Sequence, residues 1–451
     1  MDLKGNRVTV VGLARSGAAA VRLLLRERAV VSVTDRRPAG ELTEWTAGFA
    51  LGEVAWFLGG HPDEAFRGAG LIVLSPGVPL ASPPLQAARA RGVPIWSELE
   101  LASRFVSAPI SAITGSNGKS TTTALAGEMC AAAGRRTFVG GNYGVPLSEA
   151  TVPGAAWGEI VAEVSSFQLE TVATFHPSVA ALLNVTPDHL DRYPDFGSYA
   201  AAKWRIFERQ TSEDAAVLNA DDPACMDPGF TAKLAARRVC FSRRTAPAGD
   251  AVWVDAGEIV YRLGERSGRV LAIDRLRIVG VHNVENALAA TAIALLRGVD
   301  PAVIAGVLSE FRGLEHRMEF VRELRDVRYI NDSKGTNVGA VQKSIESLTS
   351  PVILIAGGVA KGADFSALRP LVARRVKKAV LLGQARPELR QAFEGVTTIA
   401  EASGMEEAVR IASESAVPGD VVLLSPACAS FDLFRDFEDR GRRFKTLVHA
   451  L

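Results

Sequence analysis

One stretch in the first third of the chain limits the fold more than any other. Residues 109–114 are apolar and predict a short buried strand, 115–118 form a glycine-rich turn, and 121–133 are rich in Ala, Leu and Met and predict a helix. A glycine turn between a strand and a helix points backbone N–H groups and the positive end of the helix dipole toward an anion. The stretch therefore predicts a phosphate-binding loop within an α/β sheet.

The end of this loop carries the side chains that a nucleotide phosphate requires. Lys119 can reach the β- and γ-phosphates, and the hydroxyl of Ser120 can bind Mg²⁺. The strict phosphate-loop motif begins with one more glycine, which this chain lacks, so the match starts only at Gly115. A chance Gly-Lys-Ser loop is the alternative interpretation, and the flanking strand and helix argue against it.

Length, composition and charge indicate a large globular protein. The 451 residues exceed one ordinary domain, and 48% hydrophobic with 22% charged residues is typical of globular enzymes. The formal net charge of +1 gives no electrostatic argument for a nucleic-acid or membrane-surface partner. The four cysteines are scattered, which argues against a zinc site or a disulfide framework and fits a reducing compartment. Since no apolar segment suits a leader or a bilayer span, we expect a cytoplasmic protein.

The N-terminal segment opens with a strand, a glycine turn, a helix and a second strand. Its turn has Gly12 and Gly17 but Ala14 in place of the middle glycine of the dinucleotide-binding fingerprint. Three interpretations stay open from these residues: a structural turn, NAD binding, or another ligand such as a nucleotide-sugar diphosphate.

The rest of the chain predicts two further sheet domains. Over residues 214–280, short β-branched and aromatic runs predict antiparallel hairpins added to a parallel sheet around the phosphate-binding loop. Beyond about residue 313, buried strands alternate with helices, as in a doubly wound sheet. We therefore predict an α/β protein with Rossmann-like domains at both ends and a P-loop ATPase-like domain, mostly parallel with added antiparallel strands, between them. The predicted domain boundaries are 1–98, 99–313 and 314–451.

Polar residues of the central segment lie near the predicted ends of strands. Glu163 comes just past a strand, where a carboxylate can hold Mg²⁺ against bound phosphates. His189 stands among acidic residues, in a mixture of possible metal ligands and capping groups. Lys203 lies on a predicted helix, and spacing alone favours a solvated lysine there.

The C-terminal segment carries polar or glycine-rich loops at three predicted strand ends. Their charged or hydroxyl-bearing residues include Asp332, Lys334, Thr336 and Lys361. Because such loops meet at one edge of a parallel sheet, we expect a ligand site there rather than surface charge alone.

Eight motifs, in this order along the chain, resemble the Mur ligases, which are the ATP-dependent amino-acid-adding enzymes of peptidoglycan synthesis. They are GSNGKST at 115–121, EVSSFQLE at 163–170, NVTPDHLDRY at 184–193, AK at 202–203, HNVEN at 282–286, HR at 316–317, NDSK at 331–334 and SPACAS at 425–430. The second and last of these most resemble the D-glutamate-adding branch of the family. Arg15 and the pair Val359-Ala360 depart from the family pattern.

The resemblance implies three domains with separate tasks: the first binds a UDP-sugar substrate, the second ATP, and the third the incoming amino acid. It implies UDP-N-acetylmuramoyl-L-alanine, D-glutamate and ATP as substrates, joined through an acyl phosphate, with Mg²⁺ as cofactor. It also implies that Lys203 is carbamylated, which reverses the interpretation from spacing. A carbamate is an anion, and an anion can bind a hard cation. No nucleic acid and no membrane is implied, and we expect a monomer.

The resemblance assigns roles residue by residue. The catalytic residues would be Lys119, Glu163, His189 and Lys203, and the Mg²⁺ ligands Ser120, Glu163, His189 and the Lys203 carbamate. ATP would be bound by Gly115, Ser116, Asn117, Gly118, Lys119, Ser120, Thr121, Asn283, Asn286, Arg317 and Asp332. The UDP-sugar substrate would be bound by Ser16, Asp35, Arg37, Gly77, Asn142 and His189, and D-glutamate by Lys334, Thr336, Lys361, Ser430 and Phe437.

Three other hypotheses about the function compete with the one that the resemblance implies. A sister ligase that adds another amino acid, or a folate polyglutamate ligase, would share the chemistry. A nicotinamide-dependent oxidoreductase is disfavoured by the missing glycine and by the phosphate-binding loop. A non-catalytic nucleotide-binding module is disfavoured by the set Lys119, Glu163, His189 and Lys203.

Overall fold

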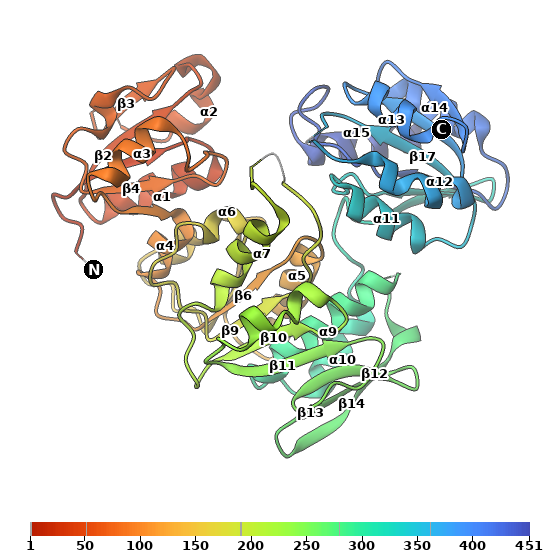
Figure 1. The fold of residues 1–451 in the computed structure, drawn as a ribbon, viewed down its shortest axis with the longest axis horizontal. Coiled ribbons are helices and arrows are strands. Elements are labelled where there is room, and N and C mark those ends of the chain that lie inside the picture. The colour runs from red at the N-terminus through yellow and green to blue at the C-terminus, as the bar shows by residue number, and fades with distance from the viewer. Residues whose placement is uncertain (1, 51, 190–191, 279, 361) are drawn as a thin grey trace. The chain divides into compact units, whose positions relative to one another are not determined.

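The structure, a computed structural model, describes residues 2–50, 52–189, 192–278, 280–360 and 362–451. Within these residues the strands form three sheets with helices packed on them, which confirms the predicted three-domain α/β class (Figure 1). The chain divides into two compact units, one of residues 1–185, 197–272 and 286–307, the other of 186–196, 273–285 and 308–451. In the described part of the chain, no helix combines the length and the apolar character needed to cross a membrane.

The first unit begins with a parallel sheet of the order β3-β2-β1-β4-β5. The chain adds strands on one side of β1 and then on the other, so the loops after β1 and β4 lie at a topological switch point, where open α/β sheets bind ligands. The strands are β1 Arg7–Val11, β2 Val30–Asp35, β3 Val54–Leu58, β4 Leu71–Leu74 and β5 Ile95–Ser97. The helices are α1 Arg15–Arg26, α2 Thr43–Thr46, α3 Pro83–Ala90 and α4 Glu98–Ser103.

The second sheet of this unit has the order β14-β13-β12-β11-β10-β9-β6-β8-β7. Its central strands are buried along their whole length, as expected for a parallel sheet covered on both faces. The strands are β6 Ile110–Thr114, β7 Thr137–Gly141, β8 Glu159–Glu163, β9 Val179–Leu182, β10 Ala215–Asn219, β11 Arg237–Ser242, β12 Ala251–Asp255, β13 Glu258–Leu263 and β14 Arg266–Ala272. The helices that follow β6 along the chain are α5 Lys119–Ala132, α6 Ser166–Leu169, α7 Phe196–Trp204, α8 Pro228–Thr231, α9 Val281–Leu296 and α10 Pro301–Glu310.

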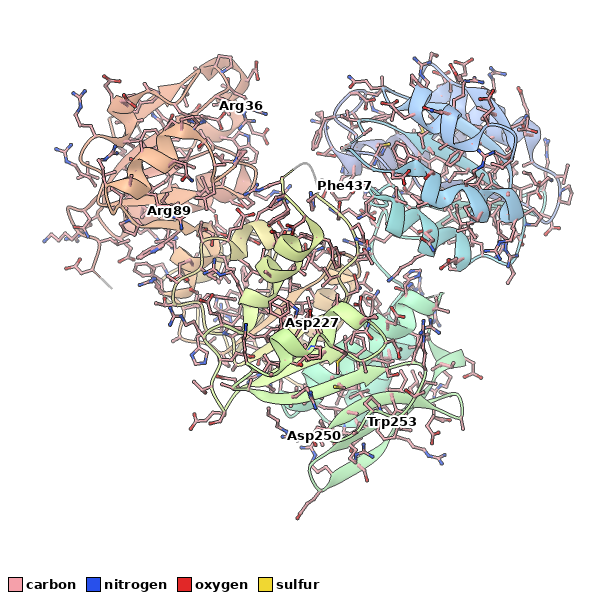
Figure 2. The ribbon with its side chains drawn as sticks, viewed as in Figure 1. Arg36, Arg89, Asp227, Asp250, Trp253 and Phe437 are labelled. Atoms are coloured by element: carbon pink, nitrogen blue, oxygen red, sulfur yellow. The ribbon has the colours of Figure 1, made fainter. Side chains whose placement is uncertain are left out.

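The hairpins predicted over residues 214–280 are correct only for the end of that region. β10 and β11 pair in parallel and extend the central sheet, and antiparallel pairing begins at β12, near Asp250 and Trp253 (Figure 2). A connection that contains α8 joins β10 to β11, and parallel neighbours need a crossover of this kind. The prediction was wrong for β10 and β11 because a short, mostly apolar run does not mark the direction in which a strand pairs.

The second unit holds the sheet β15-β16-β20-β17-β18-β19, which is parallel except for the edge strand β15. β16, β20 and β17 are neighbours, so the three predicted polar loops do follow adjacent strands at one edge. The strands are β15 Glu319–Leu324, β16 Val327–Asn331, β17 Val352–Gly357, β18 Val376–Leu382, β19 Thr398–Glu401 and β20 Val421–Leu424. The helices are α11 Val338–Glu346, α12 Arg369–Arg375, α13 Arg386–Phe393, α14 Met405–Ser415 and α15 Phe437–Ala450.

A buried carboxyl group lies where α4 packs against the segment 147–151. Glu98 is 1% exposed, and one carboxyl oxygen accepts a 2.6 Å hydrogen bond from the backbone N–H of Ser148. Its other oxygen is buried without a hydrogen-bond partner in the described part of the chain. Burial raises the pKa of Glu98 from 4.5 to about 7, since the interior disfavours the charged form.

This carboxyl group predicts a pH dependence of stability. Because its pKa is higher in the folded chain, its contribution is greatest below pH 4.5 and is lost as pH rises through about 7. We expect Glu98→Gln to remove this loss, because glutamine does not ionise. Between about pH 5 and about pH 8, the free energy of unfolding of Glu98→Gln should rise relative to that of the wild type by about 1–3 kcal/mol. Urea unfolding at both pH values measures it, with Glu64→Gln, an exposed acid of the same unit, as control. Parallel pH profiles for wild type and Glu98→Gln would contradict the expectation.

Candidate active site

The glycine turn at the end of β6 has the geometry of a phosphate-binding loop. α5 starts at Lys119, directly after the turn and two residues earlier than predicted. Gly118 caps this helix at φ +84°, where side chains are strained. A Cβ atom added there would also overlap the amide oxygen of Asn286. The turn therefore depends on glycine at this position, and the predicted strand, turn and helix are confirmed.

Two lysine amines contact the same carbonyl of this loop. Nζ of Lys119 donates to the carbonyl oxygens of Gly115 and Ser116 at 2.8 and 3.0 Å. Nζ of Lys203 donates to the Gly115 carbonyl at 2.9 Å and lies 4.6 Å from the ring centroid of Tyr199. Lys203 is 2% exposed, so the solvated lysine suggested by spacing alone is wrong. The Lys119 amine and the loop N–H groups together make the loop attractive to a polyanion such as a triphosphate.

A carboxylate stands beside the first turn of α5. Glu163 ends β8, which neighbours β6, and one of its oxygens accepts the hydroxyl hydrogen of Ser120. The other accepts a 2.7 Å hydrogen bond from the side-chain amide of Asn142, whose backbone N–H also bonds the Glu163 carbonyl at 2.8 Å. A hydroxyl and a carboxylate are oxygen ligands of the kind that Mg²⁺ prefers.

The donor set therefore fits a magnesium ion that is shared with phosphates. In the described part of the chain, no cluster of three or more His, Cys, Asp or Glu side chains could hold a metal by itself. Mg²⁺ commonly takes only one or two carboxylates from the protein and completes its shell with substrate phosphates and water. Ser120 and Glu163 are placed for such a site.

Two residues that support the loop were not assigned a role from the sequence. Asn184 accepts the backbone N–H of Asn117 at 2.9 Å, donates to its carbonyl at 3.1 Å, and accepts the N–H of Ser116 on its own carbonyl at 2.9 Å. The Tyr199 hydroxyl hydrogen-bonds the Ser116 hydroxyl at 3.0 Å. Asn184 lies in a motif after β9, and the pairing of β9 with β6, which brings it to the loop, is not visible in the sequence.

At the N-terminal sheet, an acid and an arginine clamp the loop after β1. Arg37 donates to both carboxyl oxygens of Asp35 at 3.1 and 3.0 Å and to the Leu13 carbonyl at 2.7 Å, and the Leu13 N–H donates to Asp35 at 2.7 Å. Burial by itself would raise the pKa of Asp35, but the bonds from Arg37 and Leu13 outweigh it and hold the pKa below its usual value. The carboxylate is therefore ionised and fixed at neutral pH.

The other residues predicted for the UDP-sugar substrate separate into two places. Ser16 lies in the first turn of α1, and Gly77 in the loop after β4. A 2.7 Å hydrogen bond from the Ser75 hydroxyl to the Gly12 carbonyl joins these two loops. Asn142 lies instead at the central sheet, on Glu163.

In the second unit, Asp332 lies in the loop after β16. Its carboxylate accepts the hydroxyls of Ser344 and Ser425, both at 2.7 Å, and the backbone N–H of Met318 at 3.2 Å. Burial raises the pKa of Asp332 to about 6, and the serine hydrogen bonds oppose this rise. Asp332 thus ties α11 and the loop after β20 to the end of β16.

Of the residues predicted to bind D-glutamate, Lys334 and Phe437 are in direct contact, with Nζ 3.7 Å from the ring centroid. Ser430 is buried in the loop after β20, and Thr336 is half-buried in the loop after β16. Lys361 lies outside the described residues.

The remaining predicted residues belong to different units. Asn286 is part of the first unit, where it accepts a 3.4 Å hydrogen bond from the Thr122 hydroxyl on α5. His189, Asn283 and Arg317 belong to the second unit. His189 has φ +56°, an uncommon left-handed conformation that histidine adopts more often than most residues, and its backbone N–H donates to Asp188 at 2.9 Å.

Comparison with known proteins finds relatives and family models that match almost the whole chain. Three family models match: the Mur ligase MurD-like N-terminal domain over residues 6–97, the Mur ligase middle domain over 113–294, and the Mur ligase glutamate ligase domain over 316–428. The UDP-N-acetylmuramoylalanine–D-glutamate ligase of Geobacter metallireducens is 47% identical over 451 residues, covering 100% of this chain and 99% of that protein. The enzyme of that name from Pelotomaculum thermopropionicum is 46% identical, with 100% and 99% covered.

Solved structures share the fold at low sequence identity. A pseudomurein peptide ligase type C from Methanothermus fervidus has a TM-score of 0.61 at 19% identity, covering 99% of this chain and 100% of that one. The MurF ligase of Thermotoga maritima in complex with ADP has a TM-score of 0.60 at 16% identity, covering 100% and 96%. The resemblance of the motifs is thus confirmed by relatives that span the chain from end to end, and the chain belongs to the Mur ligase family.

Proposed function

We propose that this chain joins UDP-N-acetylmuramoyl-L-alanine to D-glutamate through an amide bond, with cleavage of ATP, in the cytoplasmic synthesis of peptidoglycan precursors. The observation that carries the proposal is the convergence of Lys119, Lys203, Ser120 and Glu163 on one glycine turn. The name of the relatives at 46–47% identity supports the choice of substrates. The nucleotide in the ADP complex of the Thermotoga maritima ligase supports ATP as the energy source.

The chemistry follows from the poor reactivity of a carboxylate toward an amine. An oxygen of the substrate carboxylate attacks the γ-phosphorus of ATP, ADP leaves, and an acyl phosphate forms. The D-glutamate amine then attacks the acyl carbon, the tetrahedral intermediate expels inorganic phosphate, and the amine nitrogen loses a proton. Lys119 and the loop N–H groups stabilise the charge that spreads over the phosphoryl group during transfer.

Three residues of the first unit are proposed as ligands of Mg²⁺. Ser120 and Glu163 would hold the ion, and Lys203, as a carbamate, would contribute a further anionic ligand; His189 completes the proposed set. The ion supplies positive charge against the triphosphate when bound. The fit rests on the oxygen donors at Ser120 and Glu163 and on the burial of Lys203 against the loop.

We assign the other contacts on the same basis. The UDP-sugar site would comprise Ser16, Asp35, Arg37, Gly77 and Asn142; the ATP site would add Gly115, Ser116, Asn117, Gly118, Thr121, Asn283, Asn286, Arg317 and Asp332; and the D-glutamate site would comprise Lys334, Thr336, Lys361, Ser430 and Phe437. The boundaries 1–98, 99–313 and 314–451 are proposed for the three domains, supported by family-model matches over 6–97, 113–294 and 316–428. We propose a monomer as the working form.

The decisive assay is phosphate release from ATP and Mg²⁺ by the full chain with UDP-N-acetylmuramoyl-L-alanine. D-Glutamate, L-glutamate, L-alanine and meso-diaminopimelate are compared as amino-acid substrates. We expect release only when the UDP-sugar and D-glutamate are both present. Release with another of these amino acids would move the specificity to a sister ligase. ATP binding without release for any of them would contradict the ligase function.

A further inference from the structure

Helix α15 carries a fully buried arginine beside the loops that are proposed to bind the amino acid. Arg440 is 1% exposed. Its Nε donates to the Ser333 hydroxyl at 2.9 Å and one terminal nitrogen donates to the Ser333 carbonyl at 2.8 Å. The other terminal nitrogen donates to the carbonyls of Cys428 and Gly357 at 3.2 and 3.4 Å. One guanidinium therefore holds acceptors from three separate segments.

These acceptors mark the three loops at the carboxyl ends of adjacent strands. Ser333 follows β16, Gly357 ends β17, and Cys428 follows β20. Backbone hydrogen bonds also join the loops to one another, such as Ala427 N–H to the Gly335 carbonyl at 2.8 Å. The Arg440 guanidinium bonds to all three loops at once.

Among the described residues, no carboxylate accepts a hydrogen bond from the buried guanidinium of Arg440. All four acceptors are uncharged oxygens, and Cys428, Asp432 and Asp332 act on the guanidinium by electrostatic attraction without accepting a side-chain hydrogen bond from it. Burial lowers the pKa of Arg440 to about 10, so it remains protonated near pH 7. Burying a cation without a close anion is costly, and a bound anion nearby would offset that cost.

The loops that Arg440 holds also carry the proposed D-glutamate residues. Lys334 comes directly after Ser333, Ser430 comes two residues after Cys428, and Phe437 is the first residue of α15. The Ser333 hydroxyl donates to the Phe437 carbonyl at 2.8 Å, and this links the loop after β16 to the helix that bears Arg440.

We propose that Arg440 is a positioning residue for the amino-acid substrate: its guanidinium fixes three loops relative to one another, and its positive charge favours an amino acid with two carboxylates. This inference rests on the proposed function. A planar guanidinium presents its donors in a fixed fork, which a lysine ammonium cannot reproduce. Loss of the fork leaves buried carbonyls without hydrogen bonds and lets the loops shift. Small shifts of groups that position a substrate lower the efficiency of an enzyme strongly.

The test compares kinetic constants of full-length variants. We expect Arg440→Met, which keeps the length but loses the donors and the charge, to raise the KM for D-glutamate roughly 10- to 100-fold. The KM values for ATP and for the UDP-sugar should change less than about 3-fold, because their proposed contacts lie mostly elsewhere. Arg440→Lys restores the charge without the fork and should recover only part of the loss.

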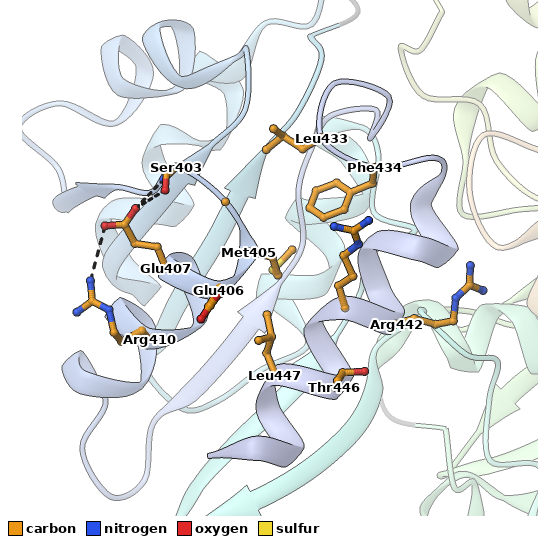
Figure 3. A pocket seen from close by; sticks show the side chains of 12 residues that line it. Ser403, Met405, Glu406, Glu407, Arg410, Leu433, Phe434, Arg442, Thr446 and Leu447 are labelled. Atoms are coloured by element: carbon orange, nitrogen blue, oxygen red, sulfur yellow. Dashed lines mark hydrogen bonds and ion pairs between the residues drawn. The ribbon is translucent and has the colours of Figure 1, made fainter.

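Arg442→Met is the matched control on the same helix. The Arg442 side chain is 53% exposed and lies at the rim of a groove of about 860 Å³ lined by Met405, Phe434 and Leu447 (Figure 3). We expect its three KM values to stay within about 2-fold of the wild type. A similar rise in the KM for D-glutamate in Arg442→Met and Arg440→Met would show that general surface charge, not the buried fork, is responsible, and would overturn the proposal.

A second variant keeps the test decisive if Arg440→Met does not fold. Ser333→Ala removes one acceptor of the guanidinium and the bond to Phe437, and we expect a rise of about 3- to 10-fold in the KM for D-glutamate only. An unchanged KM for D-glutamate in a folded Arg440→Met or Ser333→Ala protein overturns the inference, as does an equal rise in all three KM values. The kinetics of the wild-type enzyme test the proposed function separately. If the wild type prefers another amino acid, the KM for that amino acid is compared between the variants instead of the KM for D-glutamate.

Discussion

Lys119→Ala is expected to reduce ATP-dependent turnover on the order of 10³-fold, because it removes the amine that is proposed to stabilise the transferring phosphoryl group. In the structure this amine folds back onto the carbonyls of Gly115 and Ser116, in the turn that is proposed to hold the phosphates. The measurement is steady-state phosphate release at saturating UDP-sugar and D-glutamate. ATP affinity, measured by calorimetry, should fall as well, since the same amine contacts the ground-state phosphates.

A matched control separates the loss of this amine from a general loss of positive charge. Lys233 is an exposed lysine of the same unit, outside the candidate site, and Lys233→Ala should keep turnover within about 2-fold of the wild type. Near-normal turnover by a folded Lys119→Ala protein would remove the assignment of this turn as the ATP phosphate site.

Lys203→Ala should lose turnover by about 10²- to 10³-fold and regain part of it when formate or acetate is added. The reason is that the truncated side chain leaves buried space beside the Gly115 carbonyl, and a small carboxylate can supply there the anion that the carbamate would provide. Turnover is measured against carboxylate concentration, with chloride at equal ionic strength as the control.

Lys203→Arg distinguishes the carbamate from the hydrogen bond that the structure contains. Arginine can still donate to the Gly115 carbonyl but cannot form a carbamate, so the proposal expects it to be as inactive as Lys203→Ala. If Lys203→Arg keeps most of the activity, or if no carboxylate restores any in Lys203→Ala, then Lys203 acts through its hydrogen bond and positive charge, and the carbamate is wrong.

Much of the fold could be predicted from the sequence because its strongest signals are local. The strand predicted at 109–114 and the helix predicted at 121–133 agree with β6 and α5 to within two residues. The phosphate-binding turn was also predicted, since a glycine at positive φ between a strand and a helix has a local physical cause. The order of the motifs was sufficient to suggest the family.

Contacts that depend on strand order could not be predicted in the same way. The sequence places Glu163, Asn184 and Gly115 at the ends of three strands, but only the order β9-β6-β8 makes them neighbours. The parallel direction of β10 and β11 has the same origin, because a short buried run has no preference that marks its direction.

Residue type and local spacing were sufficient to predict the glycine turn, the domain class and the side chains available for phosphate and acid chemistry. The burial of Lys203 against the loop and the bonds from Arg440 to three loops depend instead on how distant segments pack, and the structure was needed to see them. Spacing along a helix assigns a charged residue to the solvent side by default. Whether such a charge is buried depends on carbonyl groups that distant segments bring to it, and these are set by packing.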